Sequence, residues 1–187
     1  SRREWLDQSS AIDKLARTFA ELEGDQFTIR DFSPASGSDE RQFCSPAINL
    51  PVIQAARTVY GEYPEYHTSL DNKSLMTIES VYDSIQKLMI FLSCFELDDI
   101  KLTSLIEGGE PMLGKRQLYP TLNGPITRKM SNDRSLDERE QLNLLLNVLS
   151  LIDGTRSLPE IAQRLRARFS DILPIIKQLQ SLRVIGS

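Results

Sequence analysis

Apolar residues recur at helical spacing in several stretches of the chain, and proline- and glycine-rich segments separate these stretches. The first stretch lies between Ser10 and Gly24, which can cap and end a helix. Its apolar positions follow the i, i+3, i+4, i+7 pattern of one helical face: Ile12, Leu15, Ala16, Phe19 and Leu22. The next residues, QFTIRDF (26–32), are rich in aromatic and β-branched side chains and predict a strand. A helix followed by a strand is typical of half of an α/β unit.

A second long helix is predicted from about residue 75 to about Cys94, with Ser74 as its cap. Its apolar stripe is broad: Ile78, Val81, Tyr82, Ile85, Leu88, Met89 and Leu92. A helix with this much apolar surface is expected to pack against a sheet.

Residues 136–187 predict three short helices, and therefore a helix-turn-helix unit. The first carries the stripe Leu142, Leu145, Leu146, Leu149 and Ile152, and Gly154 can end it. The second opens with a capping box from Ser157 to Glu160, with Pro159 in its first turn. Asp171 can cap the third, whose core positions are predicted to be Leu173, Ile176, Leu179 and Leu182. A strand after Val184 would supply the wing of a winged helix.

Two segments lack a regular pattern. Residues 33–74 are interrupted by proline and glycine, yet they are dense in charged and tyrosine residues, as loops that build functional sites often are. Residues 107–135 are rich in glycine and proline and predict an irregular connection. The predicted domains are therefore 1–106, an α/β part, and 136–187, the helix-turn-helix part.

Composition limits the classes of protein to consider. The 187 residues are 40% hydrophobic and 26% charged, as in globular domains, and the net charge of −4 argues against a polyanion-binding chain. No apolar run is long enough to cross a membrane. Cys44 and Cys94 form no CxxC pair, which favours reduced thiols and a cytoplasmic location.

The chain has one histidine, His67. This count excludes an HExxH zinc site and a Cys2His2 site within the chain, since both need paired histidines. A Ser-His-Asp triad needs only one histidine, but the GxSxG motif that often accompanies it is absent. Phosphate-binding glycine motifs are absent as well.

Two loop motifs carry a resemblance to a known family. The segment YGEYPEYHTSLDN (60–72), followed by a long helix, resembles the last metal-ligand motif of the zinc-dependent aminopeptidase superfamily. The segment GSDERQFCSPAINLP (37–51) is similar to the Ser-Asp loop of the same superfamily. With EPMLGKRQLYPTL (110–122), the combination resembles bacterial aminopeptidase-like proteins that end in a winged-helix domain and are often encoded near polysaccharide or natural-product biosynthesis genes. Two positions depart from the pattern: Glu40 stands where many members have histidine, and Ala47 stands where glycine is expected.

The resemblance implies a fold and a site. The fold would be part of a three-layer α/β aminopeptidase-like domain, followed by a small helical winged helix-turn-helix domain. His67 would be a zinc ligand, while the other ligands would lie upstream, so that this chain alone should lack the metal centre. Other residues of the two loops would line the substrate pocket or support the metal ligand: Asp39, Glu40, Arg41, Tyr60, Glu62, Tyr63, Glu65, Tyr66 and Asp71. The resemblance assigns no catalytic residue on this chain.

Two functions remain open at this point. The chain resembles part of a zinc-dependent hydrolase acting on a peptide or amide substrate, with the upstream half of the same protein as its partner. The alternative is a non-enzymatic scaffold or regulatory module that uses the helix-turn-helix for protein or nucleic-acid contacts. DNA is the less favoured partner, because residues 137–187 hold seven Lys/Arg against six Asp/Glu. Protein contacts, including a homo-oligomer, are favoured instead, and no membrane contact is expected.

Overall fold

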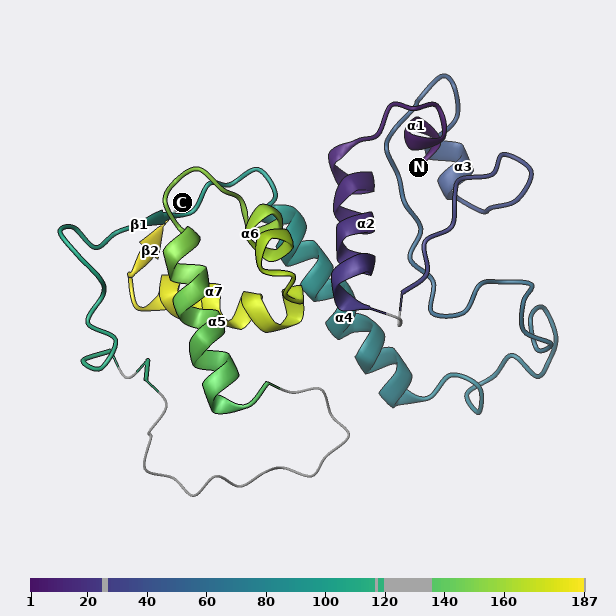
Figure 1. The fold of residues 1–187 in the computed structure, drawn as a ribbon. Coiled ribbons are helices and arrows are strands. Elements are labelled where there is room, and N and C mark those ends of the chain that lie inside the picture. The colour runs from purple at the N-terminus through teal and green to yellow at the C-terminus, as the bar shows by residue number, and fades with distance from the viewer. Residues whose placement is uncertain (25–26, 117, 120–135, 187) are drawn as a thin grey trace. The chain divides into compact units, whose positions relative to one another are not determined.

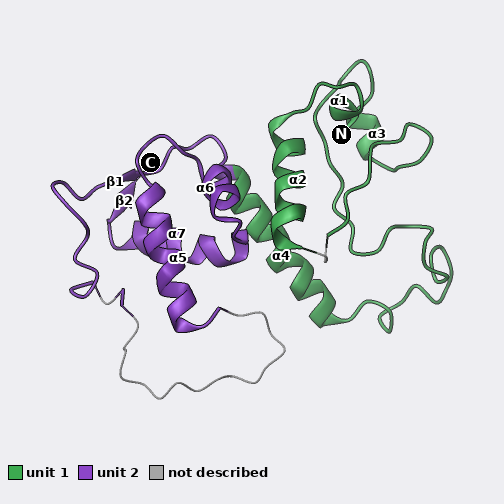
Figure 2. Cartoon of the chain, in the orientation of Figure 1, with its two compact units in different colours: residues 1–95 green, residues 96–187 purple. Residues whose placement is uncertain are grey.

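The chain folds into two compact units, residues 1–95 and residues 96–187 (Figure 2). This computed structural model describes residues 1–24, 27–116, 118–119 and 136–186. Figure 1 shows that most of the regular structure is helical. None of the described helices is long and apolar enough to cross a membrane.

The N-terminal unit is built on two helices. Helix α2 (Ala11–Glu23) begins with a capping box, in which the Ser10 hydroxyl and the Asp13 carboxylate each accept the other residue's backbone N–H, and Gly24 ends it with a φ of 84°. Both predicted ends are confirmed. Leu15 and Phe19 are buried on its inner face. Two one-turn helices, α1 (Arg2–Trp5) and α3 (Glu40–Phe43), lie elsewhere in this unit.

Helix α4 (Ile78–Glu96) lies beside α2 (Figure 1). The ring of Phe19 meets those of Phe27 and Phe91 edge-on, with centroids 5.2 and 5.3 Å apart, and this cluster joins the two helices. The predicted cap, Ser74, is wrong, because α4 begins four residues later. The Thr77 hydroxyl accepts the N–H of Ser80 at the first turn, whereas the N–H of Ser74 is engaged by the side chain of Asn72.

The strand predicted over 26–32 is absent from its described part, residues 27–32, while residue 26 lies outside the described residues. A strand needs a neighbour to pair with, and the described part of the N-terminal unit contains no other extended segment in a ladder. The only strand pair among the described residues belongs to the other unit. The regular structure of the described residues is therefore mostly helical. The described residues do not contain the sheet that a three-layer α/β domain would have.

The C-terminal unit is a winged helix. Helices α5 (Glu138–Leu151), α6 (Leu158–Leu165) and α7 (Phe169–Ser181) pack together. Strand β1 (Thr103–Ser104) pairs antiparallel with β2 (Ile185–Gly186) in the register Thr103↔Gly186. The wing expected after Val184 is therefore present, and its partner strand comes from before the three helices.

The ends of the three helices follow short polar signals. Asp137 and Glu140 form a capping box for α5 that was not predicted from the sequence. At the start of α6 the predicted box is present, and the Glu160 carboxylate accepts the N–H of Ser157 (2.6 Å). Gly154 follows α5 with a φ of 81°, and its N–H donates to the carbonyl of Leu102 (2.9 Å).

Helix α7 differs from its prediction at both ends. It begins at Phe169, so Asp171 lies in the first turn, where it binds Arg168 at 2.8 Å, rather than at the cap. Leu182, predicted to be buried, is 38% exposed. The chain turns through a left-handed residue, Arg183 (φ 52°), and Val184 fills the core instead.

Candidate functional site

The loop that contains the single histidine is held together by aromatic rings. The ring of Tyr66 lies 5.6 Å from that of Tyr63 and 6.1 Å from that of Tyr60. The imidazole of His67 stacks on Tyr66, with centroids 4.0 Å apart and an interplanar angle of 16°. The predicted residues Tyr60, Tyr63, Tyr66 and His67 therefore form one cluster, which we call the tyrosine–histidine cluster.

The backbone turns sharply at His67. Its φ is 58°, in the left-handed region that residues other than glycine rarely adopt. The turn is held by Thr68, whose hydroxyl donates to the carbonyl of Glu65 (2.7 Å) and accepts the N–H of Leu70 (3.2 Å). A residue held in this conformation is often part of a site, and here the turn leaves the imidazole exposed.

Two predicted carboxylates near the histidine bind other partners. The hydroxyl of Tyr63 donates to Asp71 (3.3 Å), and burial of the hydroxyl together with the charge of Asp71 raises the pKa of Tyr63. Glu62 forms a two-point ion pair with Arg30, with one N–O distance of 2.8 Å. The hydrogen bonds and the positive charge of Arg30 lower the pKa of Glu62. Within the described residues, no hydrogen bond involves the imidazole of His67.

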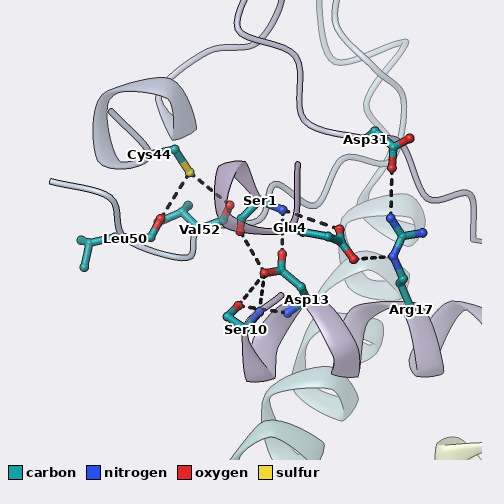
Figure 3. A network of polar contacts seen from close by, with 9 residues as sticks. All are labelled: Ser1, Glu4, Ser10, Asp13, Arg17, Asp31, Cys44, Leu50 and Val52. Carbon is teal, nitrogen blue, oxygen red and sulfur yellow. Dashed lines mark hydrogen bonds and ion pairs between the residues drawn. The ribbon is translucent and has the colours of Figure 1, made fainter. Parts of the chain in front are cut away.

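The second predicted loop, residues 37–51, is organised by Glu40 and Cys44. The Glu40 carboxylate accepts the N–H of Ser38 with both oxygens (3.0 and 2.9 Å). The same carboxylate lies so close to Gly37 that a Cβ at this position would be 2.2 Å from one of its oxygens. Cys44 is fully buried, and its thiol donates to the carbonyls of Leu50 (3.4 Å) and Val52 (3.5 Å) (Figure 3). These contacts close the loop from within.

The charged residues at the tip of this loop are available to other groups. Asp39 and Arg41 are exposed, and neither forms an ion pair within the described part of the chain. No hydrogen bond or ion pair between described residues joins this loop to the tyrosine–histidine cluster. The structure therefore presents the predicted residues as two groups rather than one.

A polar network at the start of the chain supports the same unit. The buried Asp13 accepts hydrogen bonds from Ser10 and from the Ser1 amine, and Arg17 pairs with Glu4 and Asp31 (Figure 3). This network fixes α1 against α2 and holds no predicted site residue.

Arg30, which binds Glu62, is a residue of this loop's surroundings that was not predicted from the sequence. The two residues are 32 positions apart, so no local spacing could have connected them. Nor was Thr68 predicted as the residue that shapes the histidine turn, although a Thr directly after the histidine was part of the recognised motif.

The described residues do not by themselves form a metal site. No group of three or more His, Cys, Asp or Glu side chains among them is arranged to hold a metal ion. His67 fits as a single ligand, since its imidazole is exposed and has no hydrogen-bond partner among the described residues, but one ligand does not hold zinc.

Known proteins match both units. Residues 3–98 match the family described as "Domain of unknown function (DUF4910)", and residues 101–186 match the winged helix-turn-helix family. The chain is 35% identical over 161 residues to a Clostridium acetobutylicum protein named "Putative polysaccharide biosynthesis protein with aminopeptidase-like domain", covering 86% of this chain and 34% of that protein. It is also similar to the crystal structure of a "putative peptidase" from Clostridium acetobutylicum, with 29% identity and a TM-score of 0.60, covering 95% of this chain and 36% of the other.

These matches confirm the coarse resemblance that the motifs indicated: the homologues bear peptidase or aminopeptidase-like names, and the C-terminal part is a winged helix. The chain spans about a third of the length of the relatives that it matches. Because the match over residues 3–98 covers just over half of its 187 residues, the chain belongs to the DUF4910 family, here joined to a winged helix-turn-helix domain.

Proposed function

We propose that this chain is part of a zinc-dependent aminopeptidase-like hydrolase acting on a peptide or amide substrate, and that His67 is one of the zinc ligands. The names of the relatives support a peptidase-like activity. The assignment of His67 as a zinc ligand rests on the state of its imidazole. The ring is exposed, stacked on Tyr66 and free of hydrogen bonds from described residues.

The stacking suits a ligand role. A side chain that is already ordered loses less conformational freedom when it binds, which favours binding. The Tyr66 ring restricts the imidazole from one face, and the left-handed turn at His67 fixes where the side chain leaves the backbone. Both ring nitrogens stay available, one for a metal and one for a supporting carboxylate or carbonyl.

The remaining ligands have to come from outside the described residues. This chain covers about a third of the relatives' length, so they have room for these ligands. The resemblance implies a histidine, an aspartate and a pair of glutamates upstream. Zinc bound there would polarise the substrate carbonyl and lower the pKa of a bound water. The helices α2 and α4 would then belong to a helical layer of a three-layer α/β domain whose sheet lies outside the described residues.

The other predicted residues would act around this ligand. Asp39 and Arg41, exposed and without ion pairs among described residues, would contact the charged ends of a peptide substrate, and Glu40 shapes their loop. Tyr63 and Asp71 bind one another and would hold the loop of His67 in place. Tyr60, Glu62 and Glu65 would line the surrounding pocket.

The test is the metal content of the full-length protein that contains this chain. Replacing His67 with Gln removes the ligand but keeps a polar side chain of similar size. We expect the zinc bound per molecule to fall, together with hydrolysis of amino-acid p-nitroanilides. Lys73→Ala, an exposed change in the same loop, is the matched control. Unchanged zinc content in the His67→Gln protein would refute the ligand role.

The alternative, a scaffold or regulatory module, is favoured by one observation. The winged helix has its own buried core, and His67 lies in the other compact unit. In that case the full-length protein would show no metal-dependent turnover, and residues 96–187 would mediate binding to a protein partner or to a second copy of the chain.

A further inference from the structure

The C-terminal unit contains a groove between helix α5 and the turn that joins α6 to α7 (Figure 1). Its volume of about 460 Å³ lies within the roughly 300–1,000 Å³ that is typical of ligand sites. Its apolar lining is formed by Leu136, Leu144 and Ala167, which are half-buried. The proposed zinc ligand, His67, lies in the other unit, so this groove is a separate feature of the chain.

Two asparagines of α5 line the groove without partners. The side chains of Asn143 and Asn147 are exposed, and no hydrogen bond joins either of them to another described residue. Four residues of an α-helix span about 6.0 Å, and alternate residues of an extended chain repeat about every 6.6–6.8 Å. A carboxamide can both donate to a peptide C=O and accept from a peptide N–H. The two asparagines therefore match the backbone of an extended peptide that runs along α5.

Arg166, at the end of α6, brings a positive charge to the same groove. Its φ of 51° is in the left-handed region, where a glycine usually ends a helix. The turn is held by the N–H of Ala167, which donates to the carbonyl of Ala162 (3.1 Å). Residues held in this unfavourable conformation cluster at functional sites. The guanidinium of Arg166 is exposed, and within the described part of the chain it has no hydrogen bond or ion pair.

The other charged side chains of the groove are already engaged. Arg168 binds both oxygens of Asp171 (2.8 and 2.9 Å). The Glu140 carboxylate accepts the N–H of Asp137 (2.9 Å) at the start of α5. Arg166 is thus the charge of the groove that lacks a partner among the described residues. A carboxylate complements it, because arginine and a carboxylate form strong, charge-assisted hydrogen bonds.

We infer that this groove binds an extended segment of another polypeptide that carries an acidic side chain opposite Arg166. The adjoining residues 120–135 of this chain hold three Arg or Lys and one Asp, so their charge does not complement Arg166. Asn143 and Asn147 bind the backbone of the segment, and Arg166 selects the acidic residue. The inference goes beyond the proposed hydrolase and depends neither on zinc nor on catalysis.

A peptide array probed with the labelled full-length protein tests the inference. The array carries N-acetylated octapeptides of alternating Val and Thr, which favour an extended chain, with Glu, Gln or Lys placed at one position at a time. Gln has the shape of Glu without its charge, so the Gln peptides are the matched control. We expect the best Glu peptide to retain about tenfold more protein than its Gln counterpart, as for a charge-assisted hydrogen bond. The Lys peptides should retain less still.

Variants of the protein show whether the peptide binds in this groove. Arg166→Asn removes the charge, and asparagine tolerates the left-handed region, so the turn should be retained. We expect this change to lower the affinity for the best Glu peptide about tenfold, measured by fluorescence anisotropy. Arg164→Asn, at an arginine that is also exposed but does not line the groove, is the matched control. Arg166→Glu should reverse the preference from Glu to Lys peptides, and joint replacement of Asn143 and Asn147 by Ala should weaken binding of every peptide alike.

Several results would overturn the inference. They are absence of binding to every peptide, equal binding of the Glu and Gln peptides, equal losses in the Arg164 and Arg166 variants, and unchanged binding after loss of both asparagines. The His67→Gln protein should bind the peptides as the parent does. Failure of the zinc proposal would therefore leave this result unchanged, and failure here would leave the zinc proposal standing.

Discussion

At the scale of single residues, the clearest electrostatic feature is Asp153, in the turn after α5. One oxygen of its carboxylate accepts the N–H (2.9 Å) and the hydroxyl (2.5 Å) of Thr155, and the other binds Arg156 (2.5 Å). These hydrogen bonds favour the ionised carboxylate and lower the pKa of Asp153 to about 2. The turn joins α5 to α6, so these contacts hold the connection between two helices of the winged helix.

The pH dependence follows from this shift. Because the pKa is lower in the folded protein than its ordinary value of 3.8, Asp153 stabilises the fold above about pH 4, and this contribution is lost as the pH falls towards about 2. We expect Asp153→Asn to lower the midpoint of thermal unfolding at pH 6 and to flatten its decline between pH 4 and pH 2. Asp99→Asn, at an exposed carboxylate, is the control. Parallel pH profiles for the Asp153→Asn and parent proteins would contradict the assignment.

At the scale of elements, α7 presents a buried face and an exposed face. Ile172, Leu173, Ile176 and Leu179 are buried against the other two helices, whereas Pro174, Lys177, Gln178 and Ser181 are exposed. The two faces differ in what a substitution should do.

A change on the buried face should cost stability. Ile176 is fully buried, and Ile176→Ala is expected to lower the free energy of unfolding by about 2–5 kcal/mol, because it leaves a cavity. The adjacent exposed change, Lys177→Ala, is expected to alter it by no more than about 0.5 kcal/mol. Urea titration followed by circular dichroism measures both. Similar values for the two variants would show that α7 does not pack as the structure has it.

The exposed face of α7 is poorly suited to nucleic acid. Lys177 is the basic residue of this face within the helix, and at its N-terminal end Arg168 is held by Asp171 through two hydrogen bonds. Few phosphate contacts release few counterions, so binding should be weak at physiological salt. We predict a dissociation constant above about 1 µM for duplex DNA at about 150 mM salt, measured by fluorescence anisotropy. Sub-micromolar binding with a steep salt dependence would refute this.

At the scale of the whole molecule, the first cleavage by a protease is expected between residues 107 and 135. Residues 107–110 are exposed and include two glycines with positive φ, Gly108 and Gly109. Strand β1 precedes this segment but pairs with β2, and Leu102 is fully buried in the C-terminal unit. The two fragments should therefore elute together in native buffer and separate in denaturant. First cleavage within 142–183 would show that the three helices of the C-terminal unit resist the protease less well than residues 107–135.

The sequence by itself determined where the five longer helices form and how some of them begin or end. Periodicity and capping are local, because a helix closes its hydrogen bonds within four residues. The cap at Ser10, the capping box at Ser157 and the glycine at 24 were predicted for this reason, and so was the winged helix. The motif around His67 indicated the peptidase-like relatives that the comparisons found.

Tertiary structure decided the features that depend on distant partners. Residues 27–32 have the composition of a strand but no neighbour to pair with in the described chain. Leu182 continues the apolar stripe of α7, yet the turn at Arg183 gives its place in the core to Val184. The pairing of Arg30 with Glu62 and of β1 with β2 joins residues 32 and more than 80 positions apart. Such contacts form only when the whole fold brings their partners together. A local sequence pattern therefore does not identify the partner.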